Sequence, residues 1–209
     1  IEILKNLIDK KQIGDVSTVE VRIPWWREQT YYDQEGRGTF ERDGGGVLIT
    51  QAIHTLDIML LLCGPVKEVH GMVHTSSFHQ LEAEDFSGAL LNFESGARGT
   101  LMASTTHFPG HKEEIILNCS EATVNISGAD LKVFYHNGKI ESLETDSQTG
   151  SGSDPMDFSY TWHANVIEQF WTQFTKNQQI EISAESALPV QQLIDAIVRS
   201  SKLEKKVTV

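Results

Sequence analysis

Residues 44–63 constrain the fold more than any other stretch, because three glycines there open an apolar helix. Apolar side chains surround most of the helix from Val47 to Cys63, which predicts that it is buried. Its polar residues Thr50, His54 and Asp57 are three or four apart and share one stripe. An unpaired polar group in a protein core costs about 1–3 kcal/mol. The stripe therefore either is paired within the core, with Asp57 or a carbonyl holding the histidine, or faces a polar cavity.

The glycine triplet itself has two interpretations. Gly44 to Gly46 follow Asp43 and allow backbone conformations that bring bare N–H groups close to a neighbour or a ligand. No Lys-Ser/Thr pair follows, and the chain contains no G-x-G-x-x-G, which excludes a P-loop and a dinucleotide fingerprint here. A tight strand-to-helix connection is the alternative.

Most of the remaining chain alternates between apolar and polar residues with the period of a β-strand. Seven segments show this pattern: Ser17–Pro24, Val66–Ser76, Asp85–Phe93, Gly99–Thr106, Glu113–Cys119, Ala122–Ser127 and Leu131–Tyr135. Short turns join the last six, which predicts an antiparallel meander. The expected fold class is α+β, a large, mainly antiparallel open β-sheet with helices packed on one face.

Three further helices are predicted, over residues 1–14, around Tyr160–Thr175 and around Ala184–Leu203. The second has an apolar face that is expected to pack on the sheet: Val166, Ile167, Phe170, Trp171 and Phe174. Residues 145–155, rich in Ser, Gly and Asp, predict a loop.

Composition excludes several classes of partner. The net charge is −12, and the 17 Lys and Arg residues are scattered, which argues against nucleic acid and anionic membranes. Polar residues interrupt the apolar run Val47–Cys63, so no membrane span is expected. Cys63 and Cys119 lack a C-x-x-C partner, which predicts two buried thiols in a reducing compartment and a cytoplasmic location.

Other histidines and acids are weaker candidates. His107 and His111 flank a Pro-Gly break, so their spacing does not suit a helical metal site, and no metal is expected. Three histidines on or just after a strand are expected at solvated positions: His70, His74 and His79. Three acids near a strand start are expected in an exposed turn: Glu82, Glu84 and Asp85.

Several motifs, taken in order along the chain, resemble the Gfo/Idh/MocA oxidoreductases, named after glucose-fructose oxidoreductase and inositol dehydrogenase. The matching segments are Gly14, Trp25-Trp26-Arg27, Tyr31-Tyr32-Asp33, Arg37-Gly38-Thr39-Phe40, the stretch from Asp43 to Asp57, Leu62-Cys63-Gly64, Glu84-Asp85, the stretch from Phe93 to Gly99, and Pro109-Gly110. The glycine-histidine-aspartate segment is the most specific of them.

The resemblance implies that residues 1–209 are a single substrate-binding and oligomerisation domain, without the family's N-terminal Rossmann domain. The chain begins at Ile1 rather than Met, so the natural start is expected upstream. The full-length protein is expected to transfer a hydride between NAD or NADP and a sugar, cyclitol or related polyol, with the cofactor held mainly by the missing domain. The isolated chain is expected to be inactive. A catalytically silent sugar- or cofactor-binding module, or an oligomerisation module, is the alternative.

The resemblance also implies roles for individual residues. His54 occupies the position of the family's catalytic histidine, and its ordinary pKa of about 6.5 suits proton transfer. Thr50 stands where many members carry Asp or Asn, and a hydroxyl cannot carry charge. Asp57 is expected to orient the imidazole or anchor the helix.

The remaining assignments come from the loops and the sheet. Tyr32 and His163 are expected to border the substrate with Thr50, and Trp26 and Arg27 to face the cofactor or the mouth of the cleft. A packing role for Trp26 and an ion pair for Arg27 are the alternative. Because helices cover one face of the sheet, the open face is expected to form a homo-oligomer interface.

Overall fold

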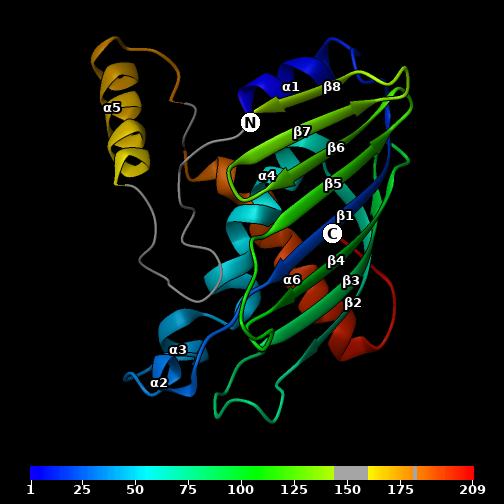
Figure 1. Cartoon of the computed structure of the whole chain (residues 1–209). Coiled ribbons are helices and arrows are strands. Elements are labelled where there is room, and N and C mark those ends of the chain that lie inside the picture. Colours follow the sequence, from blue (N-terminus) through cyan, green and yellow to red (C-terminus); the bar gives the residue numbers. More distant parts are fainter. Residues whose placement is uncertain (144–159, 181–182) are drawn as a thin grey trace.

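A nine-stranded sheet is the centre of the computed structural model, which describes residues 1–143, 160–180 and 183–209. The strands are β1 (Val16–Pro24), β2 (Val66–His74), β3 (Phe86–Phe93), β4 (Arg98–Ser104), β5 (Glu114–Cys119), β6 (Ala122–Ser127), β7 (Asp130–Tyr135), β8 (Ile140–Leu143) and β9 (Val207–Thr208). Their order in the sheet is β8-β7-β6-β5-β1-β4-β3-β2-β9 (Figure 1). The seven predicted strands are therefore present, and β8 and β9 are additions.

The position of β1 corrects the predicted meander. β1 lies between β4 and β5 and divides the meander into two antiparallel halves. It runs antiparallel to β5 and parallel to β4, with Val21 opposite Leu101. Its side chains alternate as the sequence predicts, since Val19, Val21 and Ile23 are buried while Glu20 is exposed. The sheet is thus mixed but mainly antiparallel, which confirms the predicted fold class.

Helices cover one face of this sheet (Figure 1). The helical elements are α1 (Glu2–Asp9), α2 (Gln29–Tyr32), α3 (Phe40–Asp43), the π-helix η1 (Leu48–Ala52), α4 (Ile53–Cys63), α5 (Thr161–Thr175), the 3-10 helix η2 (Glu185–Ala187) and α6 (Leu188–Leu203). α6 lies directly on β2, where a Cβ on Gly71 would come within 2.9 Å of Ile197. Ser200 Oγ accepts a hydrogen bond from Gly71 N at 2.9 Å, which joins helix and strand.

α4 lies between the sheet and solvent. Leu56 and Met59 are fully buried in the core, as the apolar sequence predicts. The helical stretch Phe40–Cys63 is long and apolar enough to cross a membrane by composition, contrary to the expectation of no such run. In the fold, however, 56% of the most apolar part of this stretch is buried, as expected for a core helix.

The predicted packing of α5 on the sheet is not found. α5 stands apart from the sheet in Figure 1, and the apolar face from Val166 to Phe174 is exposed. Ile167 is 68% exposed and Trp171 63% exposed. The loop predicted over residues 145–155 lies outside the described residues.

Candidate functional site

The polar stripe of the central helix points away from the core. His54 and Asp57 are exposed, whereas Thr55 and Leu56 between them are buried. Thr50, one turn earlier, is half-buried. The core-histidine alternative is therefore wrong for His54. Among the described residues, no hydrogen bond joins His54 to Asp57, so the imidazole is presented to whatever faces this side of the helix.

The carboxylate of Glu84 positions the start of this helix. Glu84 Oε2 accepts a hydrogen bond from Gly46 N at 3.1 Å, and Oε1 accepts one from Leu48 N at 3.1 Å. The carbonyl oxygen of Glu84 accepts a third hydrogen bond, from Val47 N at 2.8 Å. A negative charge at a helix N-terminus also interacts favourably with the helix dipole. The N–H groups of the glycine turn therefore serve a protein neighbour, and Glu84 is buried rather than in the exposed turn that we predicted.

A π-turn brings polar side chains together just before His54. Thr50 Oγ1 donates to the carbonyl oxygen of Gly46 at 2.7 Å and also contacts the side-chain oxygen of Gln51. Gln51 is buried, and its Nε2 donates to the hydroxyl of Tyr31 at 3.3 Å. π-turns are rare and occur frequently at functional sites. The hydrogen bond from Gln51 therefore connects the histidine helix to α2, which carries Tyr31.

Two guanidinium groups lie over the ring of Tyr31. The Cζ atom of Arg37 is 4.6 Å from the ring centroid, and that of Arg27 is 5.6 Å from it. Arg27 also lies over the ring of Trp25, at 5.2 Å, and is itself buried. These arginines give an acidic chain a local concentration of positive charge beside the π-turn.

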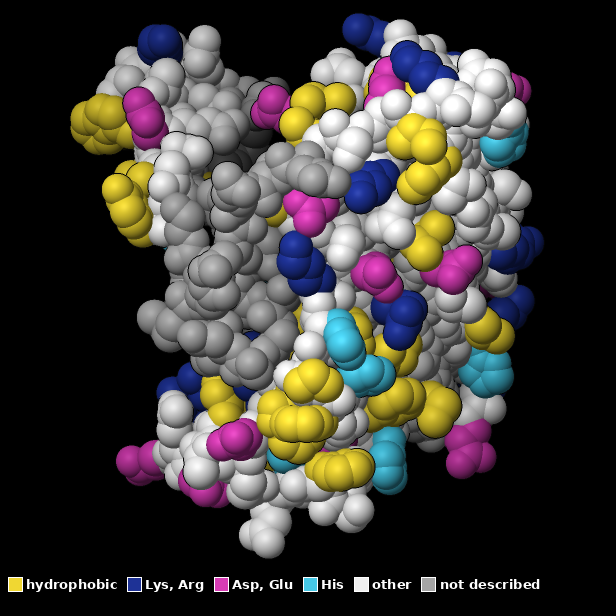
Figure 2. Space-filling model, viewed as in Figure 1, with side chains coloured by type: hydrophobic (Ala, Val, Ile, Leu, Met, Phe, Trp, Pro, Cys, Tyr) yellow, Lys and Arg dark blue, Asp and Glu magenta, His cyan; other side chains and the backbone are white. Residues whose placement is uncertain are grey.

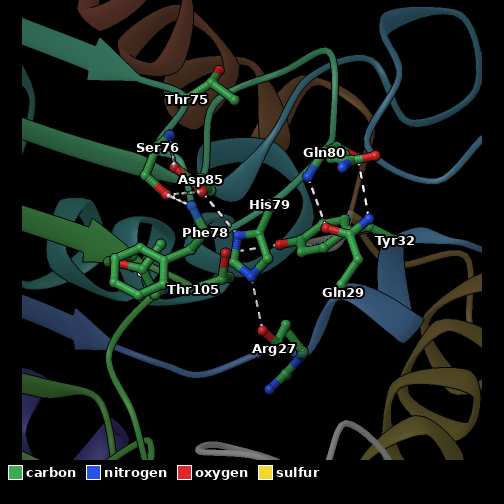
Figure 3. Close-up of polar contacts among 12 residues, drawn as sticks. Arg27, Gln29, Tyr32, Thr75, Ser76, Phe78, His79, Gln80, Asp85 and Thr105 are labelled. Atoms are coloured by element: carbon green, nitrogen blue, oxygen red, sulfur yellow. Dashed lines mark hydrogen bonds and ion pairs between the residues drawn. The ribbon is translucent and has the colours of Figure 1, made fainter.

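A buried hydrogen-bond network fixes this loop to the end of the sheet (Figure 3). His79 Nδ1 lies 2.8 Å from Asp85 Oδ2, and His79 Nε2 lies 2.8 Å from the carbonyl oxygen of Arg27. Ser76 donates to the two oxygens of Asp85, from Oγ at 2.6 Å and from N at 2.8 Å. Because Ser76 bonds the acid and not the imidazole, this is not a nucleophilic triad. The predictions that His79 and Asp85 are exposed were wrong, since both side chains are fully buried.

Tyr32 belongs to the same network and not to an open cleft. Its hydroxyl lies 2.7 Å from Thr105 Oγ1, and its ring lies 4.8 Å from that of His79. Burial raises the pKa of Tyr32 to about 12, against the opposing effect of the hydrogen bond with Thr105. Tyr32 therefore remains protonated and acts as a hydrogen-bonding group. Its neighbour Tyr31, which we did not single out, is the tyrosine beside Thr50 and Gln51.

The two residues expected at the cofactor take different directions. Arg27 stacks on Trp25 and Tyr31, whereas the ring of Trp26 contacts Phe108 edge-on at 5.5 Å and lies 6.1 Å from His79. Successive residues of an extended segment point to opposite sides, which explains the separation. A shared stacking surface for Trp26 and Arg27 is therefore absent from this structure.

Three further histidines can be placed. His163 is exposed and lies within α5, in the helix that the sequence predicts there. The rings of His107 and His111 lie 5.4 Å apart in the loop after β4, and His107 N donates to the carbonyl oxygen of Trp25 at 3.0 Å. Within the described part of the chain, no group of three or more His, Cys, Asp or Glu side chains is arranged to hold a metal ion.

Sequence reasoning missed Gln51, Tyr31, Arg37 and Glu84 as parts of this site. Gln51 interrupts an apolar helix one turn before His54, which was a usable signal. Arg37 and Tyr31 lie in a long polar and aromatic loop, and no local pattern indicates that they meet. Glu84 lies 38 residues from Gly46, so their contact depends on the fold alone.

Comparisons with known proteins identify the family. A family model described as the GFO/IDH/MocA C-terminal domain matches residues 1–125, more than half of the chain. The WlbA dehydrogenase from Bordetella pertussis, solved in complex with NADH and UDP-GlcNAcA, is 23% identical with a TM-score of 0.79, over 100% of this chain and 59% of that chain. No curated protein matches this chain significantly.

Two further structures share the fold. An NAD binding oxidoreductase from Klebsiella pneumoniae is 20% identical with a TM-score of 0.79, over 100% of this chain and 62% of that chain. Levoglucosan dehydrogenase, in complex with NADH and levoglucosan, is 17% identical with a TM-score of 0.77, over 99% of this chain and 62% of that chain. The present chain thus spans about three-fifths of each of these proteins. The family match and the shared fold show that the chain belongs to the GFO/IDH/MocA family and carries its C-terminal domain.

Proposed function

We propose that this chain is the substrate-binding domain of an NAD(P)-dependent oxidoreductase that acts on a sugar, cyclitol or related polyol. The family and its structural neighbours are oxidoreductases, and two of these neighbours were solved with NADH and a sugar or sugar nucleotide. The observation that carries the proposal is the exposed imidazole of His54 on a helix whose opposite side, with Leu56 and Met59, is buried in the core. Because Glu84 fixes the start of this helix, the exposed imidazole of His54 is held in one place, where it can contact a bound substrate.

The phosphates of a dinucleotide do not fit the glycine turn of this chain. The N–H groups of Gly46, Val47 and Leu48 already donate to Glu84, and a Cβ on Gly46 would lie 1.8 Å from the carbonyl oxygen of Glu84. We therefore assign the phosphate-binding turn to a separate Rossmann domain, outside residues 1–209. The nicotinamide, when bound beside the His54 face, supplies the acceptor or donor of the hydride.

His54 is proposed to take the proton of the substrate hydroxyl as the hydride leaves the same carbon, and to return it in the reverse reaction. Imidazole suits this transfer near neutral pH because it exists in both protonation states there. Thr50, whose Oγ1 is within hydrogen-bonding distance of Gly46 and Gln51, is proposed to orient the substrate without accepting a proton. Asp57, one turn further along the helix, is proposed to orient the imidazole of His54 or to anchor the helix.

The test uses the full-length protein with NAD(P) and a panel of sugars and cyclitols. His54→Asn is expected to lower kcat by about 100-fold or more while the melting temperature stays unchanged, which is the usual size of an acid-base contribution. His136→Asn serves as the control, because His136 is exposed in the turn after β7. Activity of the His54 variant within a factor of two of the parent would exclude the assignment.

Thr50 favours a second candidate function. Its hydroxyl is directed into the helix, toward Gly46, and lacks the charge that an Asp would bring at this position. The domain would then bind a sugar or cofactor without turnover. Calorimetry on the full-length protein separates the two functions, because ligand binding with no NAD(P) reduction by any substrate of the panel identifies the silent module.

The isolated chain is proposed to fold but to be inactive, since the N–H groups of its glycine turn are already bonded to Glu84 and do not offer the cofactor a phosphate site. NAD(P)H is expected to shift its melting temperature little. Binding at micromolar Kd or better would place the nucleotide site in this domain. The buried thiols Cys63 and Cys119 agree with a proposed cytoplasmic location, since both are free.

A further inference from the structure

Unlike three of the arginines that the structure describes, Arg37 forms no ion pair with a described carboxylate. Arg22, Arg42 and Arg199 each form an ion pair with an acid. Arg98 donates to the carbonyl oxygens of two neighbouring residues. The guanidinium of Arg37 lies over the Tyr31 ring, and its Nε atom is buried without a hydrogen-bond partner. A buried Nε without a hydrogen-bond partner, on a guanidinium that pairs with no described carboxylate, separates Arg37 from Arg98 and suits the binding of an anion.

A series of side-chain contacts connects this arginine to the proposed catalytic face. Arg37 stacks on Tyr31, the hydroxyl of Tyr31 accepts from Gln51 Nε2, and Gln51 lies one helical turn before His54. Arg27 adds a second guanidinium over the same ring. The hydroxyl hydrogen of Tyr31 is free to donate to a bound molecule, because Tyr31 is the acceptor in its bond with Gln51.

We propose that Arg37, Tyr31 and Arg27 form a subsite for an anionic group, a carboxylate or a phosphate, on the substrate whose carbon reacts at His54. The proposal rests on the proposed function and narrows its substrate class to sugar acids and sugar phosphates. A planar guanidinium binds two oxygens of a carboxylate or phosphate in parallel, and stacking on an aromatic ring orients that plane. The Tyr31 hydroxyl supplies a further donor to the same group.

The phosphates of the dinucleotide are the other source of such an anion, and the experiment separates the two. Binding is measured by calorimetry on the full-length protein with D-glucuronate, D-glucose 1-phosphate, D-glucose and NAD as separate probes. D-Glucuronate or D-glucose 1-phosphate is expected to bind at least about 10-fold more tightly than D-glucose, because glucose lacks the anionic group.

Arg37→Gln is expected to remove this preference and to leave the Kd for NAD unchanged. Arg37→Lys keeps the charge but loses the paired donors, and is expected to restore the preference only in part. The control is Arg98→Gln, since Arg98 is exposed on β4 and bonds only neighbouring carbonyls among the described residues. Matching melting temperatures confirm that each variant is folded.

Three results would overturn the subsite. The parent protein could bind the anionic sugars and glucose equally well, or Arg37→Gln could keep the preference for anionic sugars over glucose. Arg37→Gln could also weaken the binding of NAD, which would mean that the bound anion is the cofactor's phosphate. Because these assays measure binding, they are independent of turnover. A fully active His54→Asn variant would contradict the proposed function while leaving the Arg37 result to stand on its own.

Discussion

The carboxylate of Glu84 holds the N–H of Gly46 at 3.1 Å, and this contact determines where the histidine helix begins. Gly46 is required because the carbonyl oxygen of Glu84 approaches so closely that a Cβ would lie 1.8 Å from it. The loop that precedes β3 and carries Glu84 therefore packs directly on the glycine turn. The orientation of the His54 side chain depends on this contact between Glu84 and Gly46, because His54 lies further along the same continuous helical segment.

Gly46→Ala is expected to lower the free energy of unfolding by about 2–4 kcal/mol, because the added methyl group forces the helix start away from Glu84. Urea denaturation provides the measurement. Gly44→Ala is the matched control: its Cβ would meet no atom within 4 Å, although its φ of +79° imposes strain of about 1–2 kcal/mol. A loss in Gly46→Ala no larger than that in Gly44→Ala would contradict the expected clash with Glu84.

Asp85→Asn is expected to lower the free energy of unfolding by about 3 kcal/mol, because it replaces one acceptor oxygen of a fully buried hydrogen-bond network by an NH2 group, which cannot accept from Ser76. The variant should also loosen the loop carrying Tyr31, since His79 bonds the carbonyl oxygen of Arg27. Glu94→Gln controls for loss of an acid at an exposed turn and should change stability by less than about 0.5 kcal/mol. A small effect of Asp85→Asn would mean that the network is dispensable.

Alkaline pH is expected to destabilise the fold through Tyr32. Its pKa is raised from 10.0 to about 12 in the folded chain. The contribution of Tyr32 to the free energy of unfolding is therefore fully present below pH 10 and is lost as the pH rises toward 12. Urea denaturation from pH 9 to pH 12 should show a smaller loss for Tyr32→Phe than for the parent. Parallel curves for the two proteins would contradict the raised pKa.

Burial likewise raises the pKa of Cys63 to about 12 and of Cys119 to about 11. At pH 9, where an ordinary cysteine is largely thiolate, both thiols should react slowly with iodoacetamide in the folded chain and rapidly in urea. Mass spectrometry of the alkylated protein counts the modified thiols. Rapid modification of the folded chain would show that these residues open to solvent.

The open face of the sheet is expected to form a homo-oligomer interface. Four of its side chains are apolar and exposed: Met72, Leu90, Phe134 and Ile140. Figure 2 shows hydrophobic side chains scattered among charged ones over the face of the molecule that it views. Leu90→Asp should convert an oligomer to a monomer at micromolar concentration, as measured by light scattering, since it places a charge on an apolar contact surface. Leu61→Asp is the control on α4, away from this face. A monomeric parent would exclude the interface.

The sequence by itself determined the elements and the direction in which their side chains point. The period of two predicted seven strands, because alternation along a strand reflects which face is buried and needs no knowledge of the neighbouring strand. The apolar helix predicted the buried Leu56 and placed His54 on a separate polar stripe, since both follow from helical geometry. The sequence leaves open whether that stripe is paired within the core or faces outward.

Only the tertiary structure decided which elements meet. Alternation in β1 does not indicate that it lies between β4 and β5, because either partner satisfies the same hydrogen bonds. The burial of Glu84, Asp85 and His79 likewise depended on partners elsewhere in the chain. A charged or polar side chain is buried only where distant donors and acceptors compensate for lost water, so its position cannot be predicted from adjacent residues.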